Sequence, residues 1–392
     1  MAKYWCLVFV AAAPVLLAQR QDVQRLVAES ARVRKITAST PDRDDNYFGK
    51  FKRPGWSRLR ELLRDWIESR LPTSVEALDA GYAGMEARLT AELRRAGLLE
   101  PQKPVAEAGY ISSLKFSRLE GYRGALLVEA GITIPCGSDV SIYFYRFTPS
   151  RRDRLFEASG GSPNGNDLVD TQFSPPNASG GRIFYVSWLG VSCVSVWNGL
   201  KYRLWRIDAN TDKAVELLSD KHSFMTDEDS HVKLTAEELL LELTAGDMVP
   251  GFRRTYVLRY NIGPESVHRI DPVALQPQDF VHEWLIRPWS EMQSRSSPAV
   301  AKWHTFLHAD PFGGEHVRVQ QCKERPEITQ VAVEISRIGD RELPEPLTLY
   351  FLVRDKGEHR YEMSEISFSR QPGCPGESYA THENPPSLFK KE

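Results

Sequence analysis

The stretch GRIFYVSWLGVSCVSVWNGLKYRLWRIDANTDKAVELLSD, residues 181–220, has the residue pattern of an antiparallel sheet. Aromatic and β-branched residues fill its apolar runs, and glycines or polar residues separate those runs. We interpret it as three consecutive strands, at Ile183–Ser192, Tyr202–Ile207 and Ala214–Leu218. Short strands joined by polar turns are typical of antiparallel β architectures.

The same order of elements occurs once before this stretch and once after it. The second strands of the three units align as IYFYRF (142–147), YRLWRI (202–207) and VLRYNI (257–262), at a spacing of about 55–60 residues. The first strands are expected at 125–135, 183–192 and 239–245, and the third at 155–158, 214–218 and 266–270. Three units cannot close a propeller, so we expect propeller-like units in an open meander or a sandwich.

One segment of the third unit permits two interpretations. Thr235 and Glu238 are spaced as a helix capping box, and Gly246 would suit a helix end. By itself, Ala236–Ala245 would therefore be interpreted as a helix. The repeat favours a strand instead, and the sequence leaves both open.

Residues 19–105 have the pattern of a helical region that precedes the β repeat. Residues 19–38 lack glycine and proline, and apolar residues recur at helical spacing through Ser57–Leu71. Thr73 is the expected cap of a third helix, with Glu76 completing a capping box and Gly97 ending the helix.

Residues 272–392 combine helices with a second set of strands. Helices are expected from Pro277 to Ser290 and from Pro298 to Leu307. The expected strands are 316–322, 329–337, 347–355 and 360–368, which suggests a helix pair on a curled antiparallel sheet. The predicted fold class is α+β, mainly β: helical residues 19–105, a repeated antiparallel β domain over 106–271, and this α+β domain.

Residues 1–18 have the composition of a signal peptide. Lys3 supplies a positive start, and the apolar run from Leu7 to Leu17 is shorter than the ~20 residues of a membrane span. Cleavage is expected after Ala18, which leaves no transmembrane span in the mature chain and predicts a secreted or periplasmic protein. An uncleaved amphipathic anchor is the alternative.

Four cysteines remain after such cleavage, in a compartment that permits disulfides. Cys136 and Cys193 follow the first strands of consecutive units, so adjacent units would bring them together. The expected pairs are therefore Cys136–Cys193 and Cys322–Cys374.

The charge balance argues against a nucleic-acid partner. The chain has 50 basic and 52 acidic residues and a formal net charge of -2, so it provides no strong field to attract a polyanion overall. No GxSxG, GxGxxG or phosphate-binding loop occurs. We therefore predict no cofactor.

Histidines and aromatic residues provide the remaining candidate sites. His304 and His308 are four residues apart on an expected helix and His316 follows, which is a weak alternative for a metal site because Thr305 replaces the glutamate of a zinc-protease motif. Trp188, Trp197, Tyr202 and Trp205 cluster in the middle unit, either as core or as a platform for a ligand.

The sequence therefore favours an exported protein that binds a carbohydrate or protein without catalysing a reaction. The alternative is a secreted hydrolase whose carboxylates or histidines are scattered along the chain.

Overall fold

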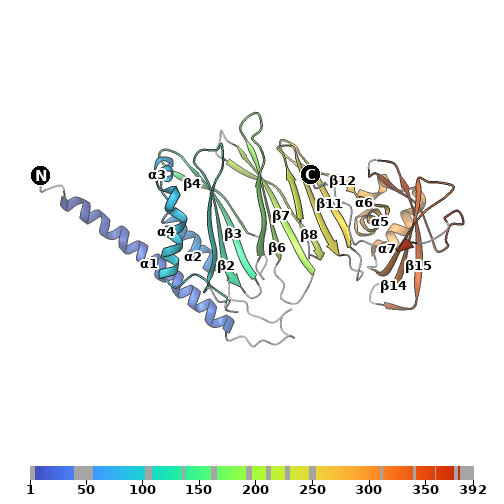
Figure 1. Ribbon diagram of the computed structural model, residues 1–392, viewed down its shortest axis with the longest axis horizontal. Helices are drawn as coiled ribbons and strands as arrows, with labels where there is room; N and C mark the ends of the chain where they lie inside the picture. The colour runs from blue at the N-terminus through green and yellow to red at the C-terminus, as the bar shows by residue number, and fades with distance from the viewer. Residues whose placement is uncertain are drawn as a thin grey trace. The chain divides into compact units, whose positions relative to one another are not determined.

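The computed structural model describes residues 5–38, 56–101, 108–134, 137–159, 166–190, 197–208, 213–225, 230–246, 253–309, 312–338, 341–357, 359–374 and 378–379. It is mostly β, with 48% strand, and its sheets are antiparallel (Figure 1). The chain divides into two compact units. Unit 1 contains residues 1–172 and 178–222, and unit 2 contains residues 173–177 and 223–392.

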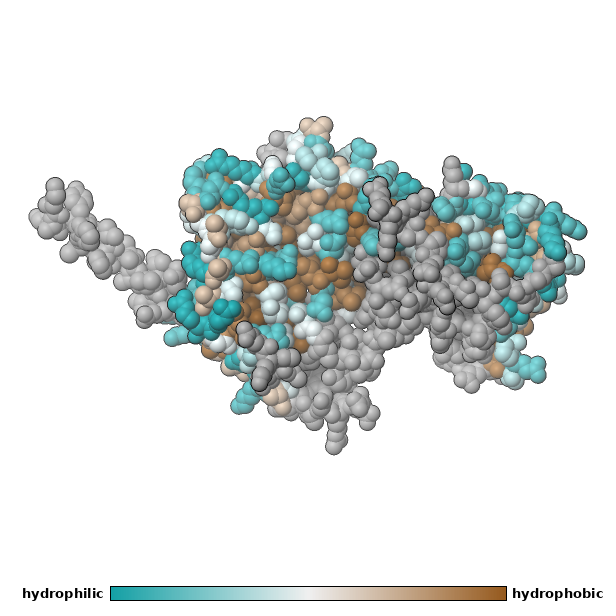
Figure 2. All heavy atoms as spheres, viewed as in Figure 1, coloured by the Kyte–Doolittle hydropathy of each residue, from teal (hydrophilic) through white to brown (hydrophobic). Residues whose placement is uncertain are grey.

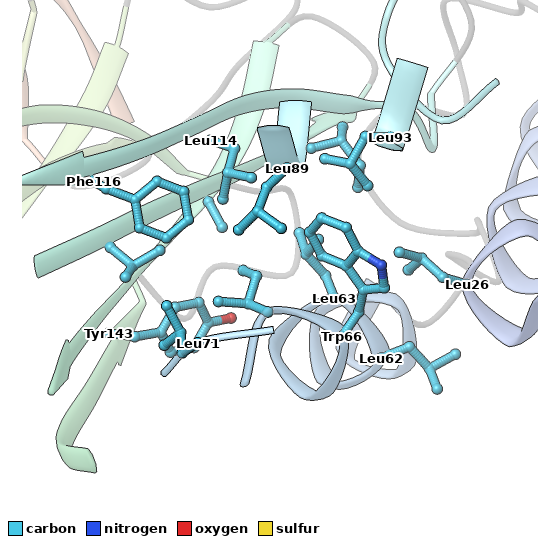
Figure 3. Close-up of a cluster of buried hydrophobic side chains, with 14 of the residues drawn as sticks. Leu26, Leu62, Leu63, Trp66, Leu71, Leu89, Leu93, Leu114, Phe116 and Tyr143 are labelled. Atoms are coloured by element: carbon cyan, nitrogen blue, oxygen red, sulfur yellow. The ribbon is translucent and has the colours of Figure 1, made fainter. Parts of the chain in front are cut away.

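Helices form the first part of unit 1, as the sequence predicts. They are α1 (Trp5–Ala38), α2 (Trp56–Glu68), α3 (Val75–Gly81), the 3₁₀ turn η2 (Tyr82–Gly84) and α4 (Met85–Arg95). The apolar stripe of α2 is buried together with Leu26 of α1 and Leu93 of α4, and Figure 3 shows these leucines around Trp66. This burial of one face explains why a helix with a charged outer face is stable here.

The helix starts differ from the predicted ones by small local shifts. Ser74, not Thr73, caps α3, because its side chain accepts the N–H of Ala77 at 3.3 Å. The expected single helix is interrupted by η2. Gly97 ends α4 in the left-handed conformation at φ 69°, as predicted.

Two strand sets complete unit 1. The first is a meander of β1 (Ile111–Arg118), β2 (Ala125–Ile134), β3 (Gly137–Phe147) and β4 (Arg152–Ser159). The second contains β5 (Asn166–Phe173), β6 (Arg182–Gly190), β7 (Trp197–Asp208) and β8 (Lys213–Met225), of which Phe173 and 223–225 belong to unit 2. Aromatic rings join the two sets. The ring centroid of Phe156 of β4 lies 4.8 Å from that of Trp205 of β7 and 5.3 Å from those of Phe144 and Phe184.

Unit 2 continues with a third strand set: β9 (Ser230–Leu234), β10 (Glu238–Gly246), β11 (Arg253–Ile262) and β12 (Val267–Val273). The ambiguous segment is a strand, since Leu239, Leu241 and Leu243 alternate into the core. The Thr235 hydroxyl accepts the N–H groups of Glu237 and Glu238. The capping-box pattern therefore closes a turn before a strand rather than starting a helix.

The rest of unit 2 combines a group of helices with a five-stranded antiparallel sheet, as expected, while the curl of that sheet stays a prediction. The helices are α5 (Pro277–Ile286), α6 (Trp289–Met292), η3 (Gln293–Arg295), η4 (Pro298–Val300) and α7 (Ala301–Ala309). The strands are β13 (Phe312–Gln321), β14 (Ile328–Ile338), β15 (Arg341–Asp355), β16 (Tyr361–Ser367) and β17 (Ser378–Tyr379). The helix predicted to reach Ser290 ends at Ile286, because Arg287 before Pro288 is extended.

A disulfide joins Cys322 after β13 to Cys374 near the end of the described chain. Cys136 and Cys193 lie outside the described residues, so their pairing stays a prediction. The repeat, its propeller-like arrangement, the domain division and the signal peptide also stay predictions. None of the described helices is long and apolar enough to cross a membrane.

Candidate functional site

Helix α7 and the end of β16 place aromatic rings at the surface of unit 2. Phe368 is 57% exposed and Phe306 is 51% exposed. Trp303, partly buried, meets Phe368 edge to face with ring centroids 5.1 Å apart. Trp303 and Phe306 are three residues apart and so share one side of α7. We call these three side chains the aromatic patch.

The buried side of α7 explains why the patch is exposed. Val300, His304 and Leu307 occupy the core side of this segment, so Trp303 lies at the margin and Phe306 beyond it. Nε2 of His304 lies 2.9 Å from the Arg287 carbonyl, and its ring packs 4.6 Å from that of Trp284. These contacts fix the orientation of α7, and they give His304 a structural role.

Small polar groups surround the rings. Lys302 and Thr305 are exposed on α7, and the Ser367 hydroxyl donates to the Ser369 carbonyl at 2.6 Å. Figure 2 shows that hydrophobic and hydrophilic residues are interspersed over the face in view, which is ordinary for a folded protein. Among the described residues, Phe306 and Phe368 are the two large aromatic side chains that are exposed.

Unit 1 contains a second candidate site, a polar row between β3 and α2. Asp139, Ser141 and Tyr143 alternate along β3 and therefore share a face. The register places Ser159 opposite Ser141 and Glu157 opposite Tyr143, on β4. All three β3 side chains are buried, and this burial raises the pKa of the Tyr143 hydroxyl well above its usual range.

Helix α2 supplies the countercharges of this row. Nε of Arg60 lies 3.3 Å from Oδ2 of Asp139, and the same guanidinium donates to the Ser159 hydroxyl at 3.2 Å. One turn further along, Arg64 pairs with Glu157 at 3.2 Å. Ala130 lies opposite Ser141 on β2, so a line of small side chains crosses the sheet and leaves room for the Arg60 guanidinium.

Asp167 of β5 lies beside this row and differs from Asp139. Its carboxylate accepts the Ser138 N–H at 2.7 Å. Burial raises the pKa of Asp167 and the charge of Asp139 raises it further, while the Ser138 N–H opposes both effects. A carboxylate paired with arginine beside one that holds its proton more tightly is the arrangement that acid–base chemistry uses. Asp139 is only 1% exposed, however, so a substrate could reach it only after a rearrangement.

The aromatic residues chosen from the sequence lie elsewhere. Trp188, Tyr202 and Trp205 are buried; Nε1 of Trp188 donates to the Val140 carbonyl and Trp205 stacks on Phe156. They present no exposed ring face to a ligand. The side chain of Trp197 lies outside the described residues, as do those of His308 and His316.

No metal centre is visible in the described part of the chain, where no three His, Cys, Asp or Glu side chains gather to hold an ion. The sequence did not identify the patch residues as exposed, because the spacing of Trp303 and Phe306 predicts a buried stripe on a helix. Phe368 is the last residue of the strand expected at 360–368, and the structure ends β16 one residue earlier, at Ser367.

Comparison with known proteins gives no family. No protein-family model matches the chain. No curated protein sequence matches it either.

Distant similarity to solved structures exists, at low scores. A glycoside hydrolase is 8% identical, with 68% of this protein and 76% of the hydrolase covered and a TM-score of 0.23. An endo-1,4-beta-xylanase from Bacteroides thetaiotaomicron is 9% identical, with 65% and 76% covered and a TM-score of 0.18. The GH32 beta-fructofuranosidase BmSUC1 of Bombyx mori is 12% identical, with 68% and 62% covered and a TM-score of 0.23. Similarity this weak carries no argument about fold or function.

Proposed function

We propose that the protein is an exported carbohydrate-binding protein without catalytic activity, and that the aromatic patch is its contact surface. Two exposed rings carry this proposal: Phe368, which contacts Trp303, and Phe306, three residues after Trp303 on α7. The apolar faces of sugar rings pack on aromatic rings, while nearby polar groups bond to their hydroxyls.

The size of the patch favours a sugar over a protein partner. A stable protein interface buries roughly 800 Å² on each partner around a large apolar centre. Here three rings are bordered by Lys302, Thr305 and Ser369, which are exposed and polar. A platform of two or three rings suits one or two sugar units.

The test compares glycan binding by the wild type and by the double variant Phe306→Ser/Phe368→Ser. A glycan array identifies the ligand, and calorimetry should show at least tenfold weaker binding for the variant, because covering a phenylalanine side chain with apolar surface contributes about 1.5–3 kcal/mol. Val215→Ser is the matched control, since Val215 is 56% exposed in unit 1. Equal binding by both variants, or no glycan binding by the wild type, would contradict the proposal.

Export is part of the same proposal and has a separate test. Cleavage after Ala18 would leave the second part of α1, which contributes Leu26 and Val33 to the core that it shares with α2. N-terminal sequencing of the protein recovered outside the cytoplasm should begin at Gln19. A chain that retains residues 1–18 would instead support the anchor alternative.

A hydrolase is the second candidate, and the pair of Asp139 and Asp167 is the observation that favours it. In this mechanism Asp167 donates a proton to the leaving group, and Asp139, paired with Arg60, accepts a proton from the attacking water. Chromogenic glycosides and esters provide the assay. Activity that Asp167→Asn abolishes, without a loss of folding, would favour the enzyme over the binding protein.

A further inference from the structure

One end of unit 1 is rich in arginine. The connection between β1 and β2 and the connection between β3 and β4 lie there together, since the Phe147 N–H donates to the Gly124 carbonyl. We call the following set the arginine rim: Arg118, Arg123, Arg146, Arg151, Arg152 and Arg182.

Ion pairs and hydrogen bonds tie the rim into one surface. Arg118 and Arg123 both pair with Asp79 of α3. Arg146 donates to the Arg123 carbonyl, and Arg182 donates to the Glu120 carbonyl at 3.1 Å. The neighbouring segments are therefore held in fixed positions before any ligand arrives, which lowers the entropy cost of binding.

The rim carries excess positive charge. Six arginines occur there with four carboxylates, those of Asp79, Glu120, Asp153 and Glu76 of α3, whereas the chain as a whole is at -2. Arg152 is used at the end of α2, where it donates to the Glu68 and Leu71 carbonyls. Arg123 and Arg151 have side chains that are 72% and 68% exposed. Each guanidinium has five N–H donors, and the observed pairings of Arg123 and Arg151 use only some of them.

The side chains of the rim favour one class of ligand. Every cation is arginine, whose planar fork bonds carboxylates in a bidentate manner better than lysine does. None of the exposed large hydrophobic residues of the described chain belongs to the rim, which disfavours a protein partner. The rings of Tyr82 and Tyr122 lie under Arg118 and Arg146, so they are not available for stacking on nucleic-acid bases.

We propose that the arginine rim binds an acidic polysaccharide, a chain that presents carboxylates at regular intervals and needs no apolar contact. This site is separate from the aromatic patch, and its test does not depend on the patch.

The test uses alginate as the carboxylated probe, dextran as the neutral one and polyglutamate as the acidic peptide. The wild-type protein should bind alginate, with an affinity that falls as salt rises, and should not bind dextran through the rim. The double variant Arg123→Ala/Arg151→Ala should bind alginate roughly tenfold more weakly. Arg58→Ala/Arg95→Ala is the control of equal charge, because both arginines are exposed on α2 and α4 outside the rim.

A second variant is expected to bind alginate more tightly, and misfolding could not produce that result. Glu120→Gln removes a rim carboxylate, keeps the backbone carbonyl that accepts from Arg182, and should strengthen alginate binding several-fold. No alginate binding by the wild type, an equal loss in the control variant, or tighter binding to polyglutamate than to alginate would each overturn the proposal. Loss of alginate binding in the phenylalanine double variant alone would overturn it too, and would assign that binding to the patch.

Discussion

The Arg60 guanidinium meets the Asp139 carboxylate at 3.3 Å beneath α2, where the Asp139 side chain is 1% exposed. The pair connects the helical part of unit 1 to its first sheet. Since Asp139 is buried and Arg60 only partly so, this contact differs from the many surface ion pairs of the protein.

Arg60→Ala should therefore destabilise unit 1 by about 2–4 kcal/mol, because it leaves a buried carboxylate without its main countercharge. Arg58→Ala is the control: its pairing with Glu61 is exposed on both sides, and its loss should change stability by less than about 0.5 kcal/mol. Urea unfolding followed by tryptophan fluorescence measures both. Equal midpoints for the two variants would show that the buried pair contributes nothing.

Asp167 should make the folded protein less stable as pH rises, whereas most carboxylates in proteins have the opposite effect. Its folded-state pKa is raised, so the protonated form favours folding; this contribution is present below the unfolded pKa and is lost as pH rises through the folded one. Asp167→Asn should consequently raise the melting temperature at pH 7 and leave it nearly unchanged at pH 3.5. Asp65→Asn, exposed on α2, should show no such gain. A lower melting temperature for Asp167→Asn at pH 7 would contradict this sign.

The cap of α3 distinguishes two neighbouring hydroxyl residues. Ser74→Ala should cost about 1 kcal/mol, since the Ala77 N–H loses its side-chain acceptor. Thr73→Ala, one residue earlier, should be close to neutral. If Thr73→Ala lowered the melting temperature more than Ser74→Ala, Thr73 would be the cap, as the sequence alone suggests.

Two left-handed glycines should differ in their tolerance of alanine. At Gly124, with φ 78°, an added Cβ would lie 2.4 Å from the Phe147 carbonyl oxygen. At Gly97, with φ 69°, an added Cβ meets nothing within 4 Å. Gly97→Ala should cost about 1–2 kcal/mol from backbone strain alone, and Gly124→Ala clearly more, in the same unfolding assay. Similar losses of unfolding free energy in the two variants would mean that the connection between β1 and β2 adjusts its backbone to the added methyl group.

Peptide mapping without reduction tests the remaining cysteine pair. A fragment linking Cys136 to Cys193 is expected, because equivalent positions in adjacent units should be neighbours. A link from either residue to Cys322 or Cys374 would contradict both this pairing and the disulfide of unit 2.

Much of the fold follows from local pattern. Continuous runs of apolar, β-branched and aromatic residues located β2, β3 and β6, which are buried along most of their length. In β7 and β10 alternate residues are buried, because side chains on one face of a strand recur with a period of two. Thr235 shows the limit of such reasoning, since its hydroxyl can close a turn as readily as it can cap a helix, and only the strand pairing decides.

The candidate sites were much less predictable. Whether Trp205 stacks in the core or Phe368 lies at the surface depends on which elements cover them, and periodicity carries no such information. The rim arises in the same way: its arginines come from separate turns that only the antiparallel register brings to one end.

The disulfide of unit 2 has a consequence for the sheet edge beside it. β17 begins four residues after Cys374 and pairs with Arg318 and Val319 of β13, at the border of the sheet. We expect reduction to free this short strand while the rest of the sheet persists, and so to uncover backbone groups that can recruit a strand from another molecule. Light scattering in dithiothreitol should therefore rise before tryptophan fluorescence reports unfolding. The bond then acts as a guard against aggregation, in addition to any support that it gives to the folded state.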